Sequence, residues 1–182
     1  MSRIATPPCV EEAPESARPT LDAVGKQLGF VPNLHRLMST SPALLSAFVG
    51  LQTPLSKTLD ASTRHAISLA VSQVNECGYC LRAHTYSAAT FGKMPIEDIA
   101  MARKGASTDP KRNAAVAFAK RVVETHGKVG GDELDAVREA GFTDSQVLEI
   151  VGVAVQFLLT NFINNVADTD IDFPEVEGAP AV

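Results

Sequence analysis

Apolar residues recur at helical spacing along most of the chain. Over residues 61–75 they stand three and four positions apart, at Ala66, Ile67, Ala70, Val71 and Val74. No segment has the period-2 alternation of β-branched residues that is typical of a strand. The pattern therefore predicts an all-α fold, a bundle of helices.

Residues that cap or break helices divide this bundle into short elements. Thr20 is expected to cap a helix from Leu21 to Leu28 that Gly29 closes. Further starts are predicted at Pro32, Ser41–Pro42, Asp60, Pro95, Asp109–Pro110 and Asp132.

The clearest start signal precedes the longest helix. Thr143 and Gln146 have the spacing of a capping box, and Phe142 and Val147 that of a hydrophobic staple. From there to about residue 166 the helix is apolar on nearly every side, which predicts burial. It approaches transmembrane length, but its glutamate, glutamine and asparagines favour a central core or subunit-interface helix.

Composition indicates one soluble globular domain. Residues 1–18 are rich in proline and predict a flexible lead-in, residues 19–172 form a single all-α domain, and residues 173–182 are expected to be an irregular tail. A net charge of −5 argues against nucleic acid or an anionic membrane as a partner. Residues 1–19 lack the apolar core of a secretory signal, so we expect a cytoplasmic location.

The candidate chemistry lies in residues 75–84. If the chain is helical from about Gly78, Cys80 lies about 60° from Cys77 at roughly 100° per residue. His84 follows Cys80 by one turn, so the three side chains share one face. Unpaired N–H groups at a helix start favour a thiolate, and an imidazole at i+4 can take or share its proton. The spacing suits a reversible dithiol.

Two other interpretations of these residues stay open. Cys77, Cys80 and His84 are zinc ligand types, and His65 could be a fourth, although no second close-spaced ligand pair exists. Alternatively, two buried cysteines and a satisfied histidine simply line a core.

The remaining histidines and the third cysteine have plainer interpretations. His35 is expected to be a partly exposed helix residue, and His126 a residue at a helix C-terminus. Cys9 is expected to be a free thiol with no assigned role.

Together the motifs resemble the carboxymuconolactone decarboxylase-like superfamily, and specifically its alkylhydroperoxidase D-like (AhpD-like), peroxidase-related branch. The resemblance rests on the segments at residues 66–72, 75–80 and 83–85, and it is supported by 140–146 and 161–165. A thioredoxin motif would instead follow a buried strand, whereas the residues before Cys77 have helical period.

The resemblance implies an oxidoreductase, an antioxidant peroxidase with a redox-active disulfide. It implies that Cys80 is the thiolate that attacks the hydroperoxide, that Cys77 is the resolving thiol that then forms the disulfide, and that His84 relays the proton. No cofactor or metal is implied. It also implies a hydroperoxide substrate, a lipoyl or thioredoxin-like dithiol reductant, and a homo-oligomer, a trimer or hexamer. The family relay begins with a glutamate at the position of His65, so His65 is either a substitute base or an ordinary surface histidine.

Two other functions remain as alternatives. One is lactone decarboxylation or a related acid/base reaction of the same superfamily, which needs no thiol pair. The other is a non-catalytic helical oligomer that binds a metal or a partner protein through the same residues.

Overall fold

The structure is a computed structural model that describes residues 2–182. Over that range the chain forms nine α-helices, one 3-10 helix and no strand, which confirms the all-α prediction. The elements are η1 (Glu15–Ala17), α1 (Arg18–Leu28), α2 (Asn33–Ser39), α3 (Pro42–Leu55), α4 (Ala61–Val74), α5 (Gly78–Thr90), α6 (Ile96–Arg103), α7 (Pro110–Glu124), α8 (Gly131–Glu139) and α9 (Asp144–Ala167).

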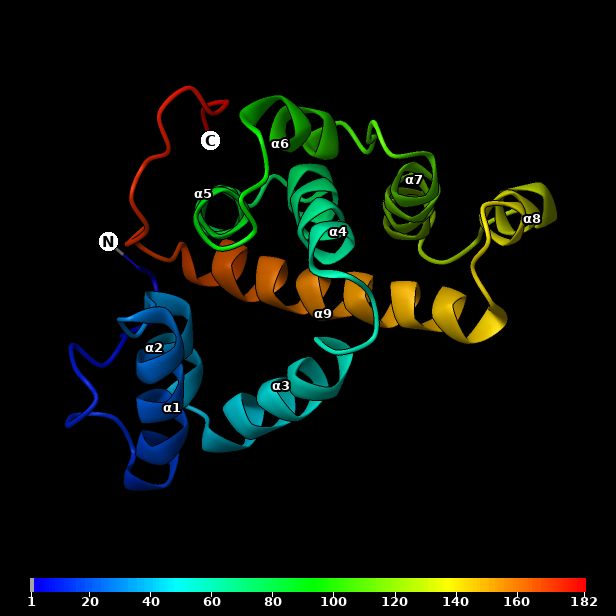
Figure 1. Cartoon of the computed structure of the whole chain (residues 1–182). Coiled ribbons are helices and arrows are strands. Elements are labelled where there is room, and N and C mark those ends of the chain that lie inside the picture. Colours follow the sequence, from blue (N-terminus) through cyan, green and yellow to red (C-terminus); the bar gives the residue numbers. More distant parts are fainter. Residues whose placement is uncertain (1) are drawn as a thin grey trace.

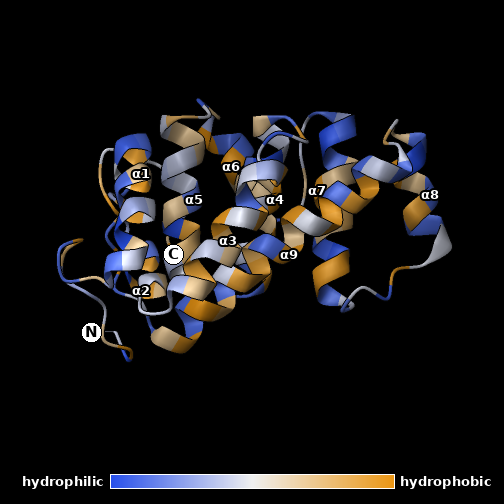
Figure 2. Cartoon of the chain, turned by 90° about the horizontal axis from the view of Figure 1, so that it is seen from below, coloured by the Kyte–Doolittle hydropathy of each residue, from blue (hydrophilic) through white to orange (hydrophobic). Residues whose placement is uncertain are grey.

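The long helix α9 crosses the whole molecule (Figure 1). Helices α4, α5 and α7 pack on one side of it and α3 packs on the other. Helix α4 lies in the middle of the bundle and contacts α5, α6, α7 and α9. Most helices carry both hydrophobic and hydrophilic turns (Figure 2), as helices that bury one face do.

Side-chain caps confirm several of the predicted helix starts. Asp60 accepts a hydrogen bond from the backbone N–H of Thr63 at 2.9 Å before α4. Thr143 accepts from the N–H of Gln146 at 3.3 Å, and the Gln146 amide oxygen accepts from the N–H of Thr143 at 3.0 Å. The capping box therefore fixes the start of α9.

Two predicted starts are wrong. Helix α1 begins at Arg18 and not after Thr20. Pro19 in its first turn explains the difference, because a proline there loses no hydrogen bond and has a helical φ. Helix α8 is preceded by Gly130, whose N–H donates to a first-turn glutamate at 2.7 Å, so Asp132 lies within the helix and is not its cap.

The prediction that α9 is buried on all sides holds for only part of the helix. By length and composition α9 could cross a membrane, but its contacts with α3, α4, α5 and α7 make it the core helix of this bundle. Four large apolar side chains of α9 are exposed in the single chain. They are Leu148, Val155, Phe162 and Val166, with exposed fractions between 48% and 72%.

Buried apolar residues form two clusters. The larger one fills the space between α4, α6, α7 and α9 and includes Ile67, Val116 and Ile150. The smaller one lies under the N-terminal helices, and it contains both Cys77 and Cys80. Ala13 and Ala17, from the segment before α1, also belong to this second cluster. The cysteine pair therefore lies where the N-terminal helices meet the main bundle.

Candidate active site

The tight connection from α4 to α5 positions the two cysteines. Glu76 has a φ of +50°, a left-handed conformation that reverses the chain between the helices. Cys77 is the N-cap of α5, and its Sγ accepts a hydrogen bond from the N–H of Cys80 at 3.3 Å. Cys77 and Cys80 form a disulfide with Cα atoms 5.3 Å apart. The predicted spacing for a reversible dithiol is therefore present.

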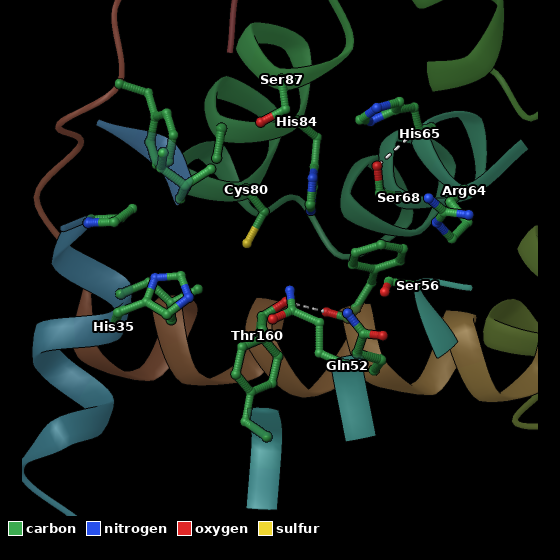
Figure 3. A pocket seen from close by; sticks show the side chains of 18 of the residues that line it. His35, Gln52, Ser56, Arg64, His65, Ser68, Cys80, His84, Ser87 and Thr160 are labelled. Carbon is green, nitrogen blue, oxygen red and sulfur yellow. Dashed lines mark hydrogen bonds between the residues drawn. The ribbon is translucent and has the colours of Figure 1, made fainter. Parts of the chain in front are cut away.

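Cys80 lines a cavity of about 300 Å³ (Figure 3). The cavity lies between α5, α4, α9 and the N-terminal helices. Cys77 is completely buried and is absent from the cavity wall. Of the two sulfurs, only that of Cys80 can therefore meet a molecule in the cavity. The wall is mostly apolar and aromatic near Cys80, with contributions from Leu34, Phe48, Tyr79, Phe157 and Phe173.

His84 projects from α5 into the same cavity, and in Figure 3 it lies between Cys80 and His65. Its ring packs edge-on against Phe157 with centroids 4.9 Å apart. Burial, with a smaller contribution from His65, lowers the pKa of His84 to about 3 while the cysteines are joined in the disulfide. The imidazole is therefore neutral near pH 7 and can accept a proton.

Reduction of the disulfide changes this electrostatic environment. A negative charge close to an imidazole favours its protonated form. A Cys80 thiolate would therefore raise the pKa of His84 toward that of an ordinary histidine. Cys80 and His84 can therefore exchange a proton only in the reduced protein, in which Cys80 is a thiol.

His65 lies on α4 and lines the cavity beside His84, so the interpretation as an ordinary surface histidine is wrong. Burial first, and then the positive charge of Arg64, lowers its pKa. Gly92, after α5, makes room for the ring, because a Cβ at Gly92 would lie 2.9 Å from His65 Cδ2.

The structure corrects the interpretation of His35. This residue of α2 was expected to be partly exposed, but it is only 9% exposed and lines the cavity on the side of Cys80 (Figure 3). Burial lowers its pKa to about 4. Its Nδ1 has no hydrogen-bond partner among residues 2–182. Because α2 and α5 are far apart in sequence, no local pattern could reveal this neighbour of the cysteine.

Asn164 is a site residue that the sequence analysis did not single out. It is 2% exposed, and its Nδ2 donates a hydrogen bond to Cys80 Sγ at 3.2 Å. Its Oδ1 has no partner within the described chain. A buried amide donor stabilises a sulfur that carries negative charge. The only sequence signal was the run of asparagines near the end of an apolar helix.

Two further asparagines of α9 hold the loop that carries the cysteines. Asn161 accepts from Asn75 Nδ2 at 3.0 Å and donates to Ser72 Oγ at 3.1 Å. Asn165 donates to the backbone carbonyl of Asn75 at 2.8 Å. These bonds fix the α4–α5 connection to α9, and so they fix Cys80 against Asn164.

Comparison with known proteins agrees with the motifs. The profile of the carboxymuconolactone decarboxylase family matches residues 42–121. Among solved structures, the alkylhydroperoxidase AhpD core of an uncharacterized peroxidase-related protein from Ralstonia eutropha JMP134 is 26% identical, with a TM-score of 0.83. That alignment covers 94% of this chain and 92% of the other. Residues 42–121 therefore match the carboxymuconolactone decarboxylase family, and the fold of the chain is AhpD-like.

More distant structures share the fold of this AhpD-like chain. A peroxidase-related protein from Silicibacter sp. TM1040 is 22% identical, covers 92% of this chain and 90% of its own, and has a TM-score of 0.77. The debrominase Bmp8, in complex with 2,3,4-tribromopyrrole, is 23% identical, covers 94% and 93%, and has a TM-score of 0.78. No curated protein matches the chain. Since the fold is shared with a debrominase, the fold does not fix the reaction.

The C-terminal tail of this AhpD-like chain closes the cavity beside the cysteines. The Tyr79 hydroxyl donates to Asp172 at 2.9 Å and accepts from the N–H of Leu34 at 3.2 Å. Burial raises the pKa of Tyr79, and the charge of Asp172 raises it further. Phe173 packs edge-on against Tyr79 with ring centroids 5.8 Å apart. Tyr79, one of the two residues between the cysteines, therefore contacts both α2 and the tail.

The arrangement gives no support to the zinc interpretation. Within residues 2–182 there is no group of three or more histidine, cysteine, aspartate or glutamate side chains that could hold a metal ion. Glu76 is exposed, on a separate face from the cavity. Cys9, the free cysteine of the described chain, contacts Glu12 at 3.7 Å and does not line the cavity.

Proposed function

We propose that the protein is a thiol-dependent alkyl hydroperoxide peroxidase, which can also act as a disulfide reductase. One observation carries this proposal. Cys80 is in the wall of a cavity, its disulfide partner Cys77 lies behind it, and a neutral imidazole, His84, lines the same cavity. The family match and the AhpD-like fold support a peroxidase-related role, and the thiol pair supports redox chemistry over acid/base chemistry alone.

Cys80 is the attacking residue in this proposal. Its sulfur is the one that a molecule in the cavity can reach, and it accepts a hydrogen bond from Asn164. In the reduced enzyme His84 accepts the thiol proton, with His65 beside it as a second base toward the polar end of the cavity. The thiolate is the nucleophile because a protonated thiol attacks peroxides poorly.

The first step transfers one oxygen atom. The Cys80 thiolate attacks the distal oxygen of the hydroperoxide, an S–O bond forms and the O–O bond breaks. The sulfur loses two electrons and becomes a sulfenic acid, while the peroxide gains them and leaves as an alcohol after taking the proton from His84.

The second step joins the two cysteines. The Cys77 sulfur attacks the Cys80 sulfenic acid, the S–S bond forms, and the hydroxyl leaves as water with the thiol proton. Cys77 is within reach because it is the N-cap of α5 and Cys80 lies in the first turn, with Cα atoms 5.3 Å apart. The product is the disulfide seen in the structure.

An external dithiol, a lipoyl group or a thioredoxin-like protein, completes the cycle. Its first thiolate attacks Cys80, a mixed disulfide forms and Cys77 leaves as a thiolate. The second thiol of the reductant then attacks its own sulfur in the mixed disulfide, so that Cys80 leaves as a thiolate and the reductant becomes a disulfide. The N–H of Cys80 donates to the Cys77 sulfur at 3.3 Å, at the N-terminus of α5, and this stabilises the leaving group. Such reductants belong to the cytoplasm, where we propose that the enzyme works.

We propose a homo-oligomer as the working form. Leu148, Val155, Phe162 and Val166 form the exposed apolar stripe of α9. Apolar side chains at helical spacing on one exposed face are typical of an interface. A trimer or hexamer would bury this stripe.

Two single-cysteine variants test the proposed roles. Cys80→Ser should abolish hydroperoxide consumption. Cys77→Ser should form a sulfenic acid that a dimedone probe traps on Cys80, because nothing resolves it. Labelling of residue 77 in Cys80→Ser, or full turnover in either variant, would contradict the assignment. Turnover of a lactone by the double variant would instead support the acid/base alternative.

A further inference from the structure

The cavity that holds Cys80 is polarised from one side to the other. In Figure 3, Cys80 and His35 lie toward one side, while Arg64, Ser56 and Ser68 lie toward the other. Aromatic rings from α3, α9 and the tail also line the cavity, at Phe48, Phe157 and Phe173. Gln52, Gln156 and Thr160 are further lining residues. A molecule in this cavity therefore meets a mostly apolar wall and a charged group on the side away from the sulfur.

Arg64 carries the only formal charge in the cavity wall. No aspartate or glutamate is among the lining residues. The three lining histidines, His35, His65 and His84, have lowered pKa values and are neutral at pH 7. The wall thus has a charge of about +1, with nothing in it to offset that charge.

Arg64 also has donors to spare. Its Nη1 donates to the backbone carbonyl of Leu59, just before α4. Within residues 2–182, its Nε and Nη2 donate to no protein group and its guanidinium pairs with no carboxylate. A guanidinium presents its donors in a fork that matches a carboxylate. At the other end, the unpartnered Nδ1 of His35 offers a buried polar contact beside Cys80.

We infer that the substrate is an apolar organic hydroperoxide that carries an anionic group, with its carboxylate bound by Arg64 and its peroxide end beside Cys80. This inference rests on the proposed function, because it names the substrate class for the same site. The reaction is the one given above, and the carboxylate takes no part in it. It orients the substrate so that the distal oxygen faces the sulfur.

A matched pair of hydroperoxides tests the inference. Cumene hydroperoxide is neutral, and its para-carboxylate has the same peroxide and ring with one added charge. With dithiothreitol as reductant, the wild-type kcat/KM should be about tenfold to a hundredfold higher for the carboxylate. Because Arg64 is only partly buried, added salt should reduce this preference.

Three arginine variants assign the preference. Arg64→Gln keeps a donor for Leu59 but removes the charge, so the ratio of kcat/KM values should fall to about one. Arg64→Lys keeps the charge and should retain part of the ratio. Arg121→Met, on an exposed face of α7 away from the cavity, should retain the wild-type ratio. Equal ratios in wild type and Arg64→Gln would overturn the inference.

A binding measurement separates this inference from the proposed function. Calorimetry on the oxidised protein with 4-isopropylbenzoate and 4-isopropylbenzamide requires no turnover. The acid should bind more tightly than the amide in the wild type, and Arg64→Gln should remove the difference. Arg64-dependent binding of the acid without any peroxide consumption would refute the peroxidase and uphold the ligand class. Equal binding of acid and amide by the wild type would refute the ligand class.

Discussion

The hydrogen bond from Asn164 to Cys80 should set the acidity of the attacking thiol. The donor is buried and lies 3.2 Å from the sulfur. A hydrogen bond to a charged group contributes about 1.5 to 3 kcal/mol. Since 1.36 kcal/mol corresponds to one pKa unit, Asn164→Ala should raise the pKa of the Cys80 thiol by about 1 to 2 units.

Asn164→Asp is the more demanding variant. Aspartate has nearly the same shape as asparagine, but an ionised carboxylate cannot donate, and its charge repels a thiolate. The pKa of Cys80 should therefore rise further than in Asn164→Ala. The control is Ser145→Ala, because this residue is exposed in the first turn of α9 and does not line the cavity.

The assay is the pH dependence of alkylation by iodoacetamide in a background that carries Cys77→Ser and Cys9→Ser. Cys80 is then the only cysteine of the chain, and its alkylation rate follows the thiolate fraction. Melting temperatures of each variant separate loss of folding from loss of the hydrogen bond. An unchanged pKa in both folded Asn164 variants, or an equal rise in Ser145→Ala, would refute the assigned role.

Two further predictions concern stability and assembly. Burial lowers the pKa values of His35 and His84 to about 4 and about 3, so the unfolded chain takes up protons that the folded chain does not. The free energy of unfolding should therefore be highest above about pH 6.5 and should fall as the pH drops, by about 2 kcal/mol per histidine at pH 5. Urea unfolding at pH 7 and at pH 5 measures this difference, and equal free energies at the two pH values would contradict the prediction. Phe162→Glu, on the exposed apolar stripe of α9, should dissociate the proposed oligomer, as measured by light scattering after size exclusion. Phe91→Glu, equally exposed but outside α9, should leave the oligomer intact. A Phe162→Glu protein that stays assembled would exclude this face as the interface.

Local chemistry made much of the fold predictable. Helix starts at Asp60 and Thr143 depend on side chains that bond to backbone groups three residues away, and both are confirmed. The relation of Cys77 to Cys80 is likewise set within one turn. Thr20 misled the prediction of α1, because a better first-turn residue, Pro19, stands one position earlier.

The parts of the site that come from distant segments were not predictable in this way. His35 reaches the cavity from α2, and Asn164 reaches the Cys80 sulfur from α9; both positions depend on how whole helices pack. Burial of α9 was overestimated for a related reason. An apolar pattern gives the preference of a side chain for a partner but does not say whether that partner belongs to the same chain.

Thiol counting before and after one equivalent of hydroperoxide tests the central claim most directly. The reduced chain has three cysteines. The account predicts that the loss of Cys77 and Cys80 occurs together, so that one titratable thiol, Cys9, remains, and that a dithiol restores the other two. A loss of only one thiol, or no loss at all, would contradict the claim that these two cysteines form a working redox pair.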